Sequence, residues 1–108
     1  MPITLRVINS GAGPLELSLL GRSPVFAITV SRLDGDVVWR RLEGETAPMI
    51  LQLRTLAPGE TLALHDDWDQ RTNRGKLVEL GDYVVEGALL TDGQPLRTPE
   101  ASLRIVAR

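Results

Sequence analysis

The chain has 108 residues, which is enough for one hydrophobic core and too few for two. Hydrophobic residues make up 43% and charged residues 24%, as in an ordinary globular domain. The formal net charge of −2 supplies no broad positive field, so it argues against partners such as nucleic acid or a membrane surface. We therefore expect a single domain spanning residues 1–108.

The chain contains no cysteine, which excludes disulfides, thiol catalysis and Cys-bound metal. Met1-Pro2 leads directly into an alternating strand, without the basic and apolar segments of a secretory leader. No apolar run approaches the length that crosses a membrane. These features predict a cytoplasmic protein.

Segments with a period of two, separated by turn residues, run through the first half of the chain. Residues 3–9 and 15–20 alternate apolar and polar side chains, whereas residues 25–30 are apolar on both faces, and all three segments predict strands. Asp34-Gly35 is favoured in tight hairpins in which both central residues have positive φ, so it predicts a hairpin leading into a strand at residues 37–41. Residues 43–48 are expected to form a loop.

The second half repeats this organisation. Residues 49–54 and 61–65 are predicted strands, and Pro58-Gly59 between them is typical of a type II turn. The polar residues 66–79 predict the longest surface loop, with Trp68 and Leu77 as its apolar anchors. Residues 83–90 and 101–106 complete the series of strands, with a turn at residues 91–95.

Tyr83 follows a Gly81-Asp82 turn and begins a strand, as a tyrosine does near the start of strand F in many immunoglobulin-like domains. There its hydroxyl donates to the backbone of the preceding connection. The strand pattern and this tyrosine predict an all-β fold, an immunoglobulin-like antiparallel β-sandwich of seven or eight strands. The expected core residues are Leu5, Val7, Leu17, Leu19, Phe26, Ile28, Leu62, Leu64, Tyr83, Val85, Leu103 and Ile105.

His65 stands beside Asp66 and Asp67, and a histidine with a carboxylate can form a general base or a metal site. Adjacent residues on a strand point to opposite faces, so we expect an ordinary strand-end histidine. Asp66, Asp67 and Asp69 lack the spacing and the closing glutamate of a calcium loop, and are expected to be solvated. No serine stands in a nucleophile elbow. We therefore expect no enzyme, no cofactor and no metal ion.

The chain holds a series of landmarks in a fixed order. They are a strand ending in Asn9, the hairpin at residues 34–40, the turn at residues 56–60, Trp68-Asp69, Gly75, Gly81-x-Tyr83-x-Val85 and Gly87. This order of landmarks resembles the BsuPI-type intracellular proteinase inhibitors. The chain departs from that pattern because residues 25–28 hold no acidic residue and because Arg40-Arg41-Leu42 follows Trp39, where the family often has an aromatic residue and a serine. The resemblance implies an immunoglobulin-like fold and inhibition of an intracellular serine protease.

The first function hypothesis is a protein-interaction module with a protein partner, inhibiting a serine protease as the resemblance implies. The alternative is a non-inhibitory structural or accessory domain of a larger assembly. Residues 69–76 offer Arg and Lys to a trypsin-like pocket, although without a disulfide to stiffen the loop simple cleavage is an equal outcome, and the loop after Trp39 is an equal candidate.

Binding is expected on the surface built by the Trp39 hairpin and residues 66–76, because Trp and Arg carry much of the energy of interfaces and loops on a rigid scaffold often bind. Core anchoring is the alternative role of both tryptophans. The candidate binding residues are Trp39, Arg40, Arg41, Trp68, Arg71 and Arg74.

Overall fold

The computed structural model describes residues 1–20, 25–42, 50–91 and 93–106. Within these residues, segments that alternate apolar and polar side chains form short strands. These residues form nine strands and no helix, so none of them belongs to a helix that could span a membrane. Every strand pairs antiparallel with a neighbour. The strands are β1 (Pro2–Ile8), β2 (Leu15–Leu20), β3 (Phe26–Arg32), β4 (Val37–Arg40), β5 (Leu51–Leu56), β6 (Thr61–Asp67), β7 (Gly81–Leu89), β8 (Leu96–Arg97) and β9 (Ala101–Ile105).

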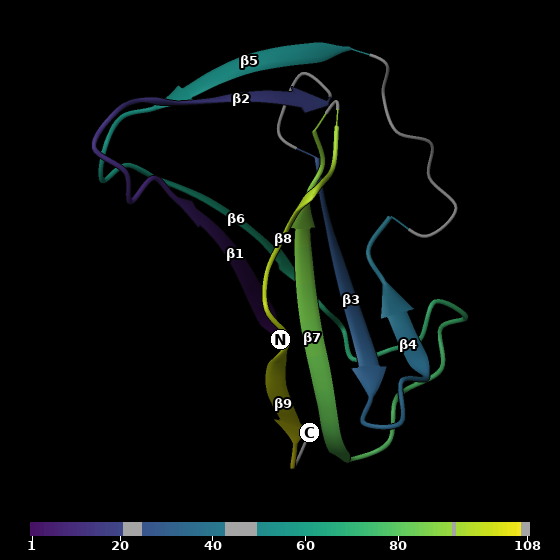
Figure 1. Cartoon of the computed structure of the whole chain (residues 1–108). Coiled ribbons are helices and arrows are strands. Elements are labelled where there is room, and N and C mark those ends of the chain that lie inside the picture. The colour runs from purple at the N-terminus through teal and green to yellow at the C-terminus, as the bar shows by residue number, and fades with distance from the viewer. Residues whose placement is uncertain (21–24, 43–49, 92, 107–108) are drawn as a thin grey trace.

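The strands form two ribbons and one larger sheet (Figure 1). β1 pairs with β6, and β2 pairs with β5. The two ribbons are joined end to end, and the chain turns a corner between them. The larger sheet has the order β4-β3-β7, and β8 and β9 both pair with β7 along its other edge. β4 is therefore an edge strand of this sheet.

The turn at Pro58-Gly59 joins β5 to β6 and is of type II, as predicted. Gly59 has φ 81°, and the backbone N–H of Glu60 donates to the carbonyl of Ala57 at 2.9 Å. The Gly59 N–H also donates to the carbonyl of Asn9 at 2.7 Å. This bond ties the turn to Asn9, the residue that directly follows β1.

The side chain of Asn9 fixes the corner between the ribbons. Its Nδ2 donates to the carbonyls of Gly13 and Leu56, both at 2.9 Å, and its Oδ1 accepts from the Gly11 N–H at 3.0 Å. Asn9 is only 5% exposed, so these bonds replace water that the side chain has lost.

One apolar cluster joins both ribbons to the larger sheet. Of the twelve expected core residues, eight are buried, and Val7, Leu64, Val85 and Leu103 are partly buried against them. Leu5 of β1 packs onto β7 at Gly87, where an added Cβ would lie 3.0 Å from its Cδ1. The cluster also contains six residues outside the prediction: Val30, Val38, Leu56, Trp68, Val78 and Leu89.

The predicted tyrosine contact is confirmed. Tyr83 is 2% exposed, and its hydroxyl donates to the carbonyl of Glu79 at 2.5 Å. This bond satisfies the buried hydroxyl and fixes the connection that enters β7.

The hairpin between β3 and β4 forms, but the predicted turn type is wrong. Only Gly35 has a positive φ, of 94°, and its N–H donates to the carbonyl of Arg32 at 2.9 Å. The backbone N–H of Arg32 donates to the carbonyl of Asp36 at 2.8 Å. Residues 33–35 therefore form the connection, which has three residues instead of two. A three-residue connection needs one left-handed residue, which Gly35 supplies.

Several predicted boundaries shift. β6 continues to Asp67, so the long loop spans residues 68–80, and we call it the 68–80 loop. Its second anchor is Val78, which is 2% exposed, whereas Leu77 is 45% exposed. β8 was not predicted. The predicted turn at residues 21–24, the loop at residues 43–48 and Met49 lie outside the described residues.

Candidate functional site

A groove of about 700 Å³ lies between β4 and the 68–80 loop. We call it the β4–loop groove. The hairpin that joins β3 to β4 closes one side of it through Arg32 and Asp36. The other lining residues are Val37, Val38 and Arg40 of β4 and Thr72, Asn73, Arg74 and Lys76 of the loop.

Asn73 fastens the loop to the edge of β4. Its Oδ1 accepts from the backbone N–H of Arg40 at 2.8 Å, and its Nδ2 donates to the carbonyl of Arg40 at 2.9 Å. A residue of a neighbouring antiparallel strand would make the same two bonds with its backbone. The carboxamide therefore covers the exposed sheet edge at this position, although 33 residues separate the two partners.

Hydrogen bonds inside the loop hold its tip in a turn. The Gly75 N–H donates to the carbonyl of Thr72 at 2.9 Å, with Gly75 at φ 86°, and the Thr72 N–H donates to the carbonyl of Lys76 at 2.7 Å. Further along, the Val78 N–H donates to the carbonyl of Gln70 at 2.9 Å. The backbone around residues 72–75 is thus turned and internally bonded, not extended.

The stacked pair of Trp39 and Trp68 connects the two sides of the groove, although neither ring lines it. Trp68 is 1% exposed and stacks on the partly buried Trp39 with ring centroids 5.5 Å apart. The Trp68 Nε1 donates to the carbonyl of Arg71 at 2.9 Å, and its backbone N–H donates to the carbonyl of Met1 at 2.8 Å. Trp68 thus occupies the core and Trp39 packs against it, which joins β4 to the start of the loop.

The groove is cationic although the whole chain has a formal charge of −2. Among the residues that the structure describes, the groove is lined by four cations, Arg32, Arg40, Arg74 and Lys76, and by one carboxylate, that of Asp36. That carboxylate lies 3.6 Å from the Arg32 Nε. The lining therefore has a formal excess of three positive charges.

Arg41 lies outside the groove and has a structural role. Its Nε donates to the Asp66 Oδ2 at 2.9 Å, its Nη1 donates to the carbonyl of Phe26 at 2.7 Å, and its guanidinium lies 3.8 Å from the centre of the Phe26 ring. The hydrogen bond from Arg41 holds the pKa of Asp66 below its ordinary value, against a smaller opposing effect of burial.

Arg71 folds along its own loop. Its Nη1 donates to the carbonyl of Gly75 at 2.9 Å, and its Nε lies 4.0 Å from the Asp69 Oδ2. Of the six predicted binding residues, the structure therefore brings Arg40 and Arg74 into the lining of the groove, whereas Trp39 and Trp68 stack on each other outside the lining. Sequence reasoning missed Arg32, Asn73 and Lys76 as lining residues. Asn73 and Lys76 belong to a segment that it did single out, residues 69–76.

His65 lies exposed on β6, opposite Thr4 of β1. The neighbouring Asp66 is held by Arg41, as described above. Within the part of the chain that the structure describes, no three His, Cys, Asp or Glu side chains are grouped so that they could hold a metal ion.

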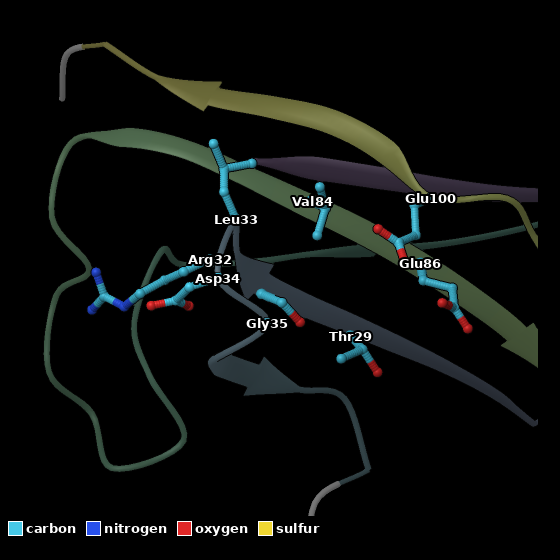
Figure 2. Close-up of a pocket in the computed structure, with 9 residues that line it drawn as sticks. Thr29, Arg32, Leu33, Asp34, Gly35, Val84, Glu86 and Glu100 are labelled. Atoms are coloured by element: carbon cyan, nitrogen blue, oxygen red, sulfur yellow. The ribbon is translucent and has the colours of Figure 1, made fainter.

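A second hollow, of about 360 Å³, lies on the sheet surface formed by β3 and β7 (Figure 2). Figure 2 shows the side chains of Glu86 and Glu100 at one end of it and Arg32 at the other. Glu86 is paired with Arg97 at 3.2 Å. Because Arg32 also lines the β4–loop groove, the two hollows meet at the hairpin between β3 and β4, one mainly acidic and the other cationic.

Comparison with known proteins assigns no family to this chain. No family model matches it, and no curated protein matches its sequence.

Proposed function

We propose that this chain is a non-catalytic protein-interaction module and that its binding surface is the β4–loop groove. The observation that carries the proposal is the fixed contact between the two sides, made by the Asn73–Arg40 bonds and the stacking of Trp39 on Trp68. A surface that is ordered before its partner arrives loses less conformational entropy on binding.

The scaffold in this proposal is an immunoglobulin-like β-sandwich. Its support is the Tyr83 hydrogen bond to the connection before β7, which is typical of such domains. The apolar cluster shared by the ribbons and the larger sheet is further support, because two sheets of a sandwich bury their facing side chains together.

The specific activity proposed is inhibition of a serine protease, as in the BsuPI-type inhibitors that the sequence resembles. The internal bonds of the 68–80 loop favour it, because a stiff loop resists cleavage without a disulfide. The turn at residues 72–75 would lie across a protease active site as a block, and would not enter it as an extended substrate.

That same turn favours a second candidate, a non-inhibitory accessory domain of a larger assembly. Proteases bind substrate backbone in extended form, and the internally bonded turn offers none at residues 72–75. The two candidates share the binding surface and differ only in whether a protease is the partner.

Partner capture from native cytosol tests the binding surface. Arg74→Glu/Lys76→Glu reverses two groove charges, and Arg6→Glu/Arg104→Glu makes the same change in net charge at exposed positions elsewhere. Partners bound by the wild type should be lost only with the groove variant. Retention of every partner by the groove variant would overturn the proposal.

Protease assays separate the two candidates. The wild-type chain is incubated with subtilisin and with trypsin, and both the residual protease activity and the integrity of the chain are followed. Inhibition by an intact chain that the groove variant loses supports the inhibitor. An intact chain with undiminished protease activity supports the accessory domain, and His65→Ala should behave as wild type in both assays.

A further inference from the structure

The chemistry of the β4–loop groove also indicates what kind of partner it fits. We infer that the groove binds an acidic segment of a protein, with carboxylates placed against Arg74 and Lys76. This inference rests on the proposed function, which names the surface but not the chemistry of its partner.

Charge complementarity is the first argument. The described lining residues have a formal excess of three positive charges on a chain whose net charge is −2, so cations are concentrated where the surface is hollowed. Opposite charges on a partner raise its association rate and favour a single orientation, and like charges are rejected. Asp36, the one carboxylate among the described lining residues, is already paired with Arg32.

The surroundings of the groove limit where such a segment can lie. Beyond the hairpin, the neighbouring hollow has the carboxylates of Asp34 and Glu100 in its lining, besides that of Glu86, which is paired with Arg97. An acidic chain that crossed the hairpin would meet these like charges, which disfavours it. The acidic part of the partner is therefore confined to the side of the hairpin that faces the 68–80 loop.

The same boundary distinguishes a protein segment from a nucleic acid. A nucleic acid carries charge along its whole length and needs a continuous cationic track. Here the cationic surface ends at Asp36 and is followed by an acidic hollow. A short acidic stretch flanked by neutral or basic residues fits this pattern better than a polyanion does.

The backbone geometry supports a preformed site. Asn73 holds the loop against Arg40, and the turn at residues 72–75 fixes the backbone that carries Arg74 and Lys76. The cations therefore arise from two segments that are already joined, so binding does not have to bring them together.

Three synthetic octapeptides test the inference by fluorescence polarisation with the full chain. They share one neutral framework and carry four Glu, four Gln or four Lys, and a single-stranded oligonucleotide of eight nucleotides is the fourth probe. The Glu peptide should bind, and the Gln and Lys peptides should not. Because exposed charges are screened within about 10 Å at 0.1 M salt, binding should weaken as salt is added.

Two charge-reversal variants show whether the Glu peptide binds in the β4–loop groove. Arg74→Glu/Lys76→Glu should weaken binding of the Glu peptide by about tenfold or more, since two attractions become two repulsions. The matched variant Arg6→Glu/Arg104→Glu should change it by less than about twofold. Equal losses in both variants would overturn the inference, because they would reflect net charge alone.

The outcomes separate this inference from the proposed function. If no acidic peptide binds while capture of cytosolic partners still depends on Arg74 and Lys76, the acidic partner is wrong and the proposed surface stands. If the oligonucleotide binds as tightly as the Glu peptide and competes with it, the groove is a general polyanion site and the inference is also wrong. If neither peptides nor cytosolic partners depend on the groove, both proposals fall.

Discussion

Replacing Asn9 with alanine tests whether one buried side chain holds the corner between the two ribbons. The change removes the donations from Nδ2 to the carbonyls of Gly13 and Leu56 and the bond that Oδ1 accepts from Gly11. Asn9 is 5% exposed, so water reaches these partners poorly in the folded chain. Both acceptors and the Gly11 donor are then left without this partner.

The magnitude follows from these three bonds. A hydrogen bond contributes about 0.5–1.5 kcal/mol net, and a buried group left unpaired costs about 1–3 kcal/mol. The bond to Leu56 is buried and the other two are partly buried. We therefore expect Asn9→Ala to lower the free energy of unfolding by about 3 kcal/mol, a large fraction of the total for a domain of this size.

Asn73→Ala is the matched control, because the same side chain there makes two bonds that are exposed to solvent. Water can replace them, so the expected loss is below about 1 kcal/mol. Urea unfolding followed by tryptophan fluorescence measures both variants, since Trp68 passes from a buried site to water. A loss for Asn9→Ala no larger than that for Asn73→Ala would refute the reasoning.

Three further predictions use the same unfolding assay. Tyr83→Phe should cost about 1–2 kcal/mol because the Glu79 carbonyl loses its donor, and unchanged stability would contradict the role given to this bond. The pKa of Asp66 is lowered from 3.8, so its pairing with Arg41 stabilises the fold above that pH and this stabilisation is lost as the pH falls through the lower, folded-state pKa. Asp66→Asn should therefore lose less stability than wild type between about pH 5 and pH 2, and an equal loss would count against the pairing. Gly59→Ala should cost about 1–2 kcal/mol because Gly59 has φ 81° and an added Cβ meets nothing within 4 Å, so only backbone strain acts. Gly13→Ala, with equal space and no positive φ, should be neutral or slightly stabilising, and equal effects of the two changes would exclude backbone strain as the cause.

Local sequence determined most of the strands and most of their inward faces. β2 spans the residues that the alternation predicted, and Leu17 and Leu19 are buried as expected. The type II turn at Pro58-Gly59 was also readable, because Pro fixes φ and Gly accepts a positive φ within the same few residues. Such features depend on neighbours in the chain, so a single sequence contains them.

Tertiary pairing decided the orientation of β5. Leu51 and Leu53 are 53% and 81% exposed, while Leu56 is fully buried. Because the period of a strand is two, burial of Leu56 places Arg54 and Gln52 on the inward face, opposite Leu17 and Leu19 of β2. The apolar pattern of residues 49–54 alone contains nothing that reveals this choice.

The candidate site shows the same division. The sequence showed which segments hold the Arg, Lys and Trp residues, and it indicated the Trp39 hairpin and residues 66–76 as the binding surface. Only the folded chain decided that Asn73 bonds to Arg40, that Trp68 is buried and that Arg41 and Arg71 lie outside the groove. Hydrogen bonds and charge pairs depend on distances of a few ångströms between atoms. Where the partners lie 33 residues apart, the fold sets those distances, and no local pattern records them.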